Sequence, residues 1–234
     1  MSQHGKKYLD AVKKVDHNKE YSLEEAVKLL KEVAFAKFDE TIEIHARLGI
    51  DPRQPDQNVR TTVLLPAGLG KTVRILVFAE AEAARIAEGA GADYVAGDEM
   101  IAKIKNEEWT DFDVSIAVPD MMRKVSGLGK VLGRKGLMPN PKAGTVVPPN
   151  DLPRAIQEAR AGRVEFRSDK TGNVHIPVGK IKFTEAQILE NAQAVIEALK
   201  RAKPSSAKGI YVKRLVLTST MAPAIRLDAN TLMA

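Results

Sequence analysis

The sequence contains no cysteine, few aromatic residues and no long apolar run. The absence of cysteine excludes disulfides and thiolate metal sites, and it favours a reducing compartment. No segment approaches the roughly 18 consecutive apolar residues of a membrane span, and the N-terminal residues lack the apolar centre of a signal peptide. Because 44% of the residues are hydrophobic and 28% are charged, the composition is typical of a folded globular protein. We therefore expect a cytoplasmic protein that does not contact a membrane.

Residue patterns typical of enzymes and metal sites are also missing. The histidines lie at positions 4, 17, 45 and 175, and none has the partner four residues away that a helical metal site requires. His45 falls on the polar side of a predicted strand, which is typical of a solvated or hydrogen-bonded side chain. Carboxylates such as Asp39 and Glu40 are adjacent in sequence, so their spacing does not bring them together in a cleft. The sequence therefore predicts no catalytic residues, no metal and no cofactor.

The stretch GLGK occurs twice and resembles part of a phosphate-binding loop. The first copy, at 68–71, runs on to a threonine, but Leu65 stands where a P-loop has its first glycine. A predicted strand follows it, whereas a P-loop must open a helix whose N–H groups face the phosphates. The second copy, at 127–130, has its glycines one residue too far apart for a dinucleotide site and follows the third strand of its unit. Both nucleotide-binding interpretations are disfavoured.

The net charge of +6 is unevenly distributed along the chain. Between residues 161 and 234 there are 12 Lys and Arg against 6 Asp and Glu, whereas the two signs balance in 1–68 and in 69–160. A basic final third on an otherwise balanced protein indicates a surface that faces a polyanion. The alternative is a solvated face that serves only solubility.

Hydrophobic periodicity predicts two kinds of unit. Ser22 is the predicted N-cap of a helix over 22–34, and strict alternation predicts a half-buried strand over 41–50. From residue 71 the pattern changes to β-α-β-α-β, which is typical of a parallel, helix-covered sheet. Further predicted elements are a strand at 60–66, a helix at 154–162, a hairpin at 163–179, a long helix at 184–203 and a strand at 210–220.

Three segments carry side chains suited to a polyanion. In AFAKFDET, Phe38 lies among Lys37 and Thr41, where an aromatic ring can stack on a base and its neighbours can bond phosphate or 2′-OH groups. The alternative is that Phe35 and Phe38 both pack in the core. In the predicted hairpin, Arg163, Arg167 and Lys170 project from a strand pair while Asp169 and Thr171 stabilise its turn. In TSTMAPAIR, hydroxyl groups and Met221 suit the shallow minor groove of RNA.

Taken in order, AKFDETIEIHARLGIDPRQPDQNVR, GLMPNPKAGTV, GRVEFRSDKTGNVHIPVGK and TSTMAPAIR resemble the bacterial large-subunit ribosomal protein L1 family, which forms the mobile stalk near the tRNA exit site. The resemblance spans nearly the whole chain. It implies a mixed α/β and α+β fold in which residues 1–68 and 161–234 form a split β-α-β, ferredoxin-like domain. Residues 69–160 would form an inserted Rossmann-like α/β domain. The implied hinge comprises Gly68, Gly70, Ala161 and Gly162, where glycine supplies backbone freedom.

The resemblance also implies function and partners. Similar proteins bind a stalk segment of large-subunit rRNA, assist release of deacylated tRNA from the exit site, and repress translation of their own mRNA. The rest of the large ribosomal subunit is a further implied partner, and we expect a monomer when the protein is free. The alternative is a free RNA-binding translational regulator without a ribosomal role.

The family's RNA contacts fall on three groups of residues in this chain. They are Lys37, Phe38 and Thr41; Arg167, Asp169, Lys170, Thr171 and Gly172; and Thr218, Ser219, Thr220, Met221 and Ala222. The family usually has glycine after the methionine, so Ala222 would be strained if that position needs φ > 0.

The middle segment is a candidate for a secondary RNA contact, because it contains six basic residues and no acid: Arg123, Lys124, Lys130, Arg134, Lys135 and Lys142. A plain solvated face is the alternative.

Overall fold

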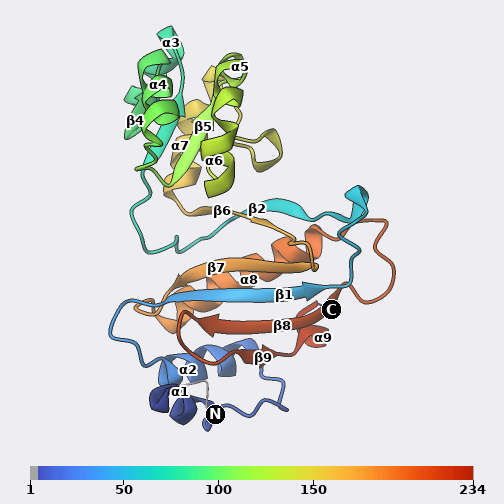
Figure 1. The fold of residues 1–234 in the computed structure, drawn as a ribbon. Helices are drawn as coiled ribbons and strands as arrows, with labels where there is room; N and C mark the ends of the chain where they lie inside the picture. Colours follow the sequence, from blue (N-terminus) through green and yellow to red (C-terminus); the bar gives the residue numbers. More distant parts are fainter. Residues whose placement is uncertain (1–4, 234) are drawn as a thin grey trace. The chain divides into compact units, whose positions relative to one another are not determined.

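The computed structural model describes residues 5–233, so His4 lies outside the described residues. The described chain separates into two compact units (Figure 1). The first comprises the chain up to Gly70 and from Val164 onward, and the second comprises Lys71–Arg163. Each unit has its own buried core.

The first unit is built on a four-stranded sheet in the order β7-β1-β8-β9. The strands are β1 (Thr41–Leu48), β7 (Asn173–Lys180), β8 (Val212–Ser219) and β9 (Ile225–Leu227). β1 runs antiparallel to both β7 and β8, and α8 (Glu185–Arg201) connects those two strands. Since β1 lies between two parallel strands that a helix joins, the topology is a split β-α-β unit.

The helices of this unit cover one face of the sheet. Alternate residues of β1, beginning with Ile42, are buried in one core with residues of α8 and α2 (Leu23–Val33). Both helices begin as the sequence predicts: Ser22 accepts a hydrogen bond from the backbone N–H of Glu25, and Thr184 forms a capping box with Gln187. The remaining helices are α1 (Lys6–Val12) and α9 (Ala229–Met233). The opposite face of the sheet carries the half-buried and exposed side chains of β1, β7 and β8.

The predicted hairpin at 163–179 is wrong as a strand pair. β6 (Arg163–Arg167) pairs with β2 (Arg60–Leu64) in a separate two-stranded sheet, while β7 pairs with β1. The chain changes sheets at Ser168, whose backbone N–H donates to the carbonyl of Val59. Alternation along each strand indicates its buried face but not its partner, which is why the sequence pattern did not distinguish the two arrangements.

The second unit is a parallel sheet with helices on both faces. Its strand order is β4-β3-β5, with β3 (Ile75–Phe78) central, β4 (Tyr94–Ala96) and β5 (Val114–Ala117). All four residues of β3 are buried. Ile75 and Val77 pack with α3 (Ala81–Gly89) and α7 (Leu152–Arg160), whereas Leu76 and Phe78 face the other core. The helices α4 (Asp98–Glu107), α5 (Met122–Val125) and α6 (Gly129–Lys135) contribute buried side chains to that core.

Together these two sheets confirm the mixed α/β and α+β fold class that the sequence predicts. Short 3-10 turns complete the chain at Pro55–Gln57, Pro119–Met121, Ser126–Leu128, Pro141–Ala143 and Pro149–Asp151.

Candidate nucleic-acid interface

The first group of candidate residues surrounds the beginning of β1. We call Lys37, Phe38, Thr41, Thr220 and Met221 the Phe38 cluster. Phe38 is 55% exposed and Met221 is 48% exposed, although a large apolar side chain normally finds cover in a folded domain. The alternative that Phe38 packs in the core is therefore wrong, whereas Phe35 is partly buried against the core.

A buried carboxylate joins the two loops of the Phe38 cluster. Glu40 has no exposed surface, and its Oε1 accepts a hydrogen bond from the backbone N–H of Ala36 at 3.0 Å. Its Oε2 accepts from the Ser219 hydroxyl at 2.5 Å and from the backbone N–H of Met221 at 3.0 Å. Because charge-assisted bonds are stronger than neutral ones, Glu40 holds the loop before β1 against the loop after β8. The sequence shows only that Glu40 is adjacent to Asp39, and this adjacency did not predict the role of Glu40.

Hydrogen bonds of three threonines reinforce this junction. The backbone N–H of Thr41 donates to the Thr220 hydroxyl at 3.0 Å, and Lys180 donates from its Nζ to the Thr41 hydroxyl at 2.8 Å. Thr218 donates to the carbonyl of Ala222 at 3.1 Å. These bonds bring residues from three strands to one end of the sheet.

Two residues expected to contact RNA lie beneath the surface instead. Ser219 is 3% exposed and Ala222 is 8% exposed, so their side chains hold the loop in place and do not face solvent. The backbone strain considered for Ala222 does not arise, because the only non-glycine residues with positive φ in the described part of the chain are Ala81 and Glu108.

The second group of candidates forms the turn before β7. We call Arg167, Asp169, Lys170, Thr171 and Gly172 the turn cluster. The Asp169 carboxylate accepts hydrogen bonds of 2.8 Å from the backbone N–H groups of Thr171 and Asn173 and from the Thr171 hydroxyl. These bonds, led by the one from the Asn173 backbone, lower the pKa of Asp169 to about 2. The turn is consequently held with Lys170 and Thr171 exposed, while Gly172 is buried at φ +80°.

The two clusters lie at opposite ends of β1. Thr41 pairs with Lys180 at one end, and Arg47 pairs with Asn173 at the other. At about 3.3 Å per residue, the six steps along the strand from Thr41 to Arg47 span roughly 20 Å. The structure therefore brings the 37–41 and 218–221 segments together but places the turn cluster at a separate end of the same sheet.

The basic residues of the second unit are less available than their sequence implies. Lys124 forms ion pairs with Glu80 at 2.5 Å and with Asp98 at 2.8 Å, and Arg134 approaches Glu108 at 3.7 Å. The hydrogen bonds to Asp98 and Glu80 raise the pKa of Lys124. These acidic partners, Glu80, Asp98 and Glu108, lie outside residues 121–142, the basic segment that contains no acidic residue. For Arg123, Lys130 and Lys142, no ion pair is found within residues 5–233.

Neither GLGK copy forms a phosphate-binding loop. After Lys71 the next element is the strand β3, so no helix N-terminus follows the first copy. Gly70 instead adopts φ +72° against the ring of Phe183, where an added Cβ would lie 2.6 Å from Cε1. The second copy spans a 3-10 turn and the start of α6, and its glycines at 127 and 129 face open space.

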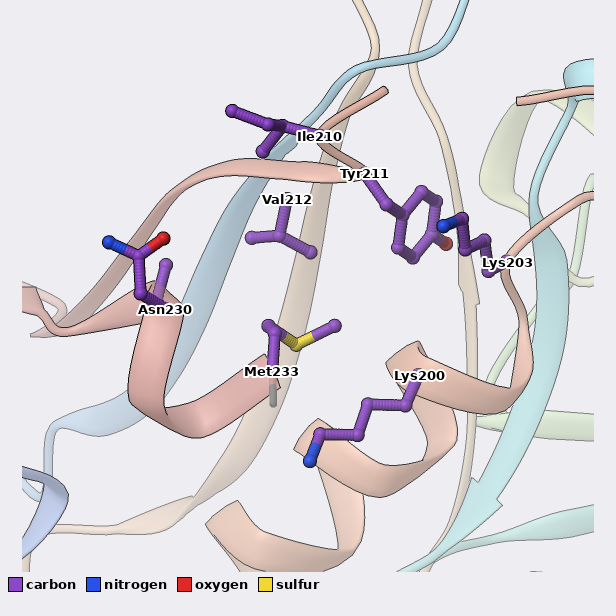
Figure 2. A pocket seen from close by; sticks show the side chains of 8 residues that line it. Lys200, Lys203, Ile210, Tyr211, Val212, Asn230 and Met233 are labelled. Carbon is purple, nitrogen blue, oxygen red and sulfur yellow. The ribbon is translucent and has the colours of Figure 1, made fainter. Parts of the chain in front are cut away.

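A shallow pocket of about 350 Å³ lies between the end of α8, the start of β8 and α9. Figure 2 shows the side chains that line it, which include Lys203, Ile210, Tyr211 and Asn230. The Tyr211 hydroxyl is buried and has no hydrogen-bond partner among residues 5–233, and burial raises the pKa of Tyr211 to about 12. The pocket adjoins Val212, whereas the Phe38 cluster lies beyond Ser219, so the pocket is not part of that cluster.

Residues 5–233 contain no cluster of three or more His, Asp and Glu side chains suited to a metal ion. None of the helices in this range combines the length and apolar character that a bilayer crossing requires. What the fold presents is exposed aromatic, thioether, hydroxyl and cationic groups on a rigid sheet, an arrangement typical of nucleic-acid-binding proteins.

Comparison with known proteins gives one consistent family. Residues 30–223 match the model of the ribosomal protein L1p/L10e family. Large ribosomal subunit protein uL1 of Chloroflexus aggregans is 57% identical over 228 residues, covering 97% of this chain and 96% of the relative. The proteins of the same name from Thermomicrobium roseum and Persephonella marina are 54% and 53% identical, covering 99% and 100% of this chain and 96% and 97% of the relatives.

The chain therefore belongs to the ribosomal protein L1p/L10e family. This is a family of structural, RNA-binding ribosomal proteins and not of enzymes, in agreement with the sequence prediction.

Proposed function

We propose that this chain binds the stalk segment of large-subunit rRNA through its first unit, on the ribosome in the cytoplasm. The observation that carries the proposal is the Glu40 network, which holds the exposed side chains of Phe38 and Met221 at one end of the sheet. An exposed ring beside hydroxyls and a lysine can stack on an unpaired base while its neighbours bond the sugar and phosphate. The turn cluster supplies a second contact about 20 Å away.

We also propose two roles that follow from this binding. The protein assists release of deacylated tRNA from the exit site, and it represses translation of its own mRNA by binding an element that resembles the rRNA site. The residues around Gly68, Gly70, Ala161 and Gly162 act as the hinge between the two units in the first role. Positive φ at Gly68, Gly70 and Gly162 supports the choice of glycine at these places.

A filter-binding titration tests the rRNA proposal. The stalk fragment of large-subunit rRNA is compared with an unrelated hairpin of equal length at several salt concentrations. We expect nanomolar binding that exceeds the control by about a hundredfold at physiological salt. Weak binding that is equal for both RNAs and vanishes as salt rises would mean that the protein binds RNA only through non-specific electrostatic attraction. That result would contradict the proposal.

The regulatory role has its own experiment. A reporter preceded by the leader of the chain's own mRNA is translated in vitro with increasing amounts of protein, with and without the rRNA fragment as competitor. We expect repression that the competitor relieves. If the reporter is insensitive to the protein while the rRNA titration succeeds, the regulatory role is wrong and the ribosomal one remains.

A further inference from the structure

The outer face of the β7-β1-β8 sheet carries two arginines directly opposite each other. Arg47 of β1 pairs in register with Arg214 of β8, and both side chains are exposed. Within residues 5–233, neither arginine takes part in an ion pair. Like charges directly opposite on neighbouring strands destabilise a sheet, because their Cβ atoms are only about 5 Å apart. A phosphate between the guanidinium groups would turn this repulsion into two charge-assisted contacts.

A second cross-strand pair lies beside the first. His45 of β1 pairs with His175 of β7, and their Nδ1 atoms are in direct hydrogen-bonding contact. The two rings meet edge to face with centroids 4.6 Å apart. Because His45 is two residues before Arg47 on the same face of the strand, the two pairs are separated by roughly 7 Å along β1.

Carboxylates at both outer nitrogens determine how this pair holds protons. Glu43 lies 3.3 Å from the Nε2 of His45, and Asp169 lies 4.0 Å from the Nε2 of His175. The closer carboxylate favours a proton on the Nε2 of His45, which leaves its Nδ1 to accept a hydrogen bond from the Nδ1–H of His175. The Nε2 of His175 then carries no proton and faces the Asp169 carboxylate.

The pair therefore has room for one additional proton. Added at the Nε2 of His175, it meets the Asp169 carboxylate and makes the pair cationic. A second proton would place N–H groups on both Nδ1 atoms, facing each other, so it is excluded while the contact persists. Burial lowers the pKa of His45, the neighbouring His175 lowers it further, and Glu43 opposes both. From β8, the residue that faces His45 is the uncharged Val216.

We propose that this outer face is a phosphate-binding track for the RNA backbone, formed by Arg47 and Arg214 and continued by the His45–His175 pair in its singly protonated form. The inference rests on the proposed rRNA-binding function and extends it. The histidine pair lies between the two clusters and the arginine pair lies at the end of β1 nearest the turn cluster, so an RNA strand that contacts Phe38 at one end of the sheet and Lys170 at the other passes over the track. Binding along it takes up one proton, and RNA affinity rises as the pH falls.

The arginine part of the track is tested by salt-dependent RNA titrations of Arg47→Gln and Arg214→Gln with the rRNA stalk fragment. Each variant should bind about tenfold more weakly at physiological salt and reduce the salt slope by about 1. Arg201→Gln on α8, at the other face of the sheet, is the matched control and should bind like the unaltered protein. Urea unfolding supplies a readout without RNA, because removing either arginine relieves repulsion and should leave the unfolding midpoint unchanged or higher.

The histidine part is tested by the same titration between pH 5.5 and 8.5. The unaltered protein should gain affinity on acidification, by up to about tenfold per pH unit for one proton taken up. The double variant His45→Gln/His175→Gln should remove this gain, whereas His17→Gln, outside the sheet, should keep it. If the arginine variants bind like Arg201→Gln, or if the double variant His45→Gln/His175→Gln leaves the pH dependence intact, the corresponding part of the track is wrong. Loss of specific rRNA binding by the unaltered protein at every pH would instead contradict the proposed function itself.

Discussion

The Glu40 carboxylate accepts a hydrogen bond of 3.0 Å from the backbone N–H of Met221, although the two residues are 181 positions apart in the chain. The same carboxylate holds Ser219 and the backbone of Ala36. Both oxygens of a buried acid are thus used to join two loops, and each loop carries one exposed apolar side chain of the Phe38 cluster. Glu40 is a positioning residue, since it orders the site from below and has no exposed surface.

Substitution of Glu40 by glutamine tests that role. The amide is nearly isosteric, but either orientation turns its NH2 group toward a backbone N–H that the carboxylate now satisfies. A buried donor left unpaired costs about 1–3 kcal/mol, so we expect the free energy of unfolding in urea to fall by that amount. RNA affinity should fall as well, by no more than the ~1–3 kcal/mol of a lost stacking contact. Glu32→Gln on the exposed side of α2 is the control, and equal behaviour of the two variants would contradict the positioning role.

Phe38→Ala and Met221→Ala should each weaken RNA binding by about 1–3 kcal/mol, the scale of one lost stacking contact. Their exposure predicts that the free energy of unfolding stays within about 0.5 kcal/mol of the unaltered value. Leu64→Ala provides a matched control, because Leu64 is also 50% exposed but lies on β2. Early melting of the Phe38 and Met221 variants would show that these side chains support the core and that the site is wrongly assigned.

The turn cluster should respond to acid through Asp169. Its folded-state pKa of about 2 lies below the ordinary value of 3.8, so its contribution to stability is present above pH 4. That contribution is lost as the pH falls from about 4 to about 2, because the unfolded chain takes up the proton first. NMR titration of the carboxyl group should give the low value directly. In Asp169→Asn this part of the pH dependence of stability should disappear. If it persists, another carboxylate is responsible for it.

Gly70, in the first GLGK copy, and Gly133, three residues after the second copy, should differ in their tolerance of alanine. Gly70→Ala forces a side chain into φ +72° against the ring of Phe183, so we expect a loss of at least 1 kcal/mol in unfolding free energy. Gly133, within α6, has open space at its Cβ position and no positive φ, so Gly133→Ala should stabilise the protein by about 0.5–1 kcal/mol. Thermal melting of both variants compares them. Equal tolerance would mean that the contact with Phe183 does not constrain Gly70.

Lys135→Ala should leave rRNA affinity nearly unchanged, because Lys135 lies in the second unit and donates a hydrogen bond to the Thr110 hydroxyl. The filter-binding titration with the stalk fragment measures this, with Lys170→Ala in the turn cluster as the variant expected to lose affinity. A large loss for Lys135→Ala would show that the second unit shares the rRNA site.

The sequence by itself determined most elements of both units, although not α1, β9 or α9. Alternation over 41–50 predicted β1, the Ser22 and Thr184 regions marked the starts of α2 and α8, and the β-α-β-α-β pattern after residue 71 indicated the parallel sheet. These signals are local, because they depend on the two-residue period of a strand, the 3.6-residue period of a helix and the side chain that caps its first turn. The motifs that resemble the ribosomal family were equally readable, since they are short and contiguous.

Strand partners and the burial of single polar residues were decided only by the tertiary structure. Alternation along 163–167 and 173–180 is equally compatible with one hairpin and with two sheets, and the register with β1 and β2 made the choice. The same register joins Arg47 to Arg214 and His45 to His175 across more than a hundred residues. Glutamate is normally a surface residue. Glu40 is buried only because the chain returns over it after β8. Long-range pairing of this kind depends on the packing of the whole core, which no local pattern encodes.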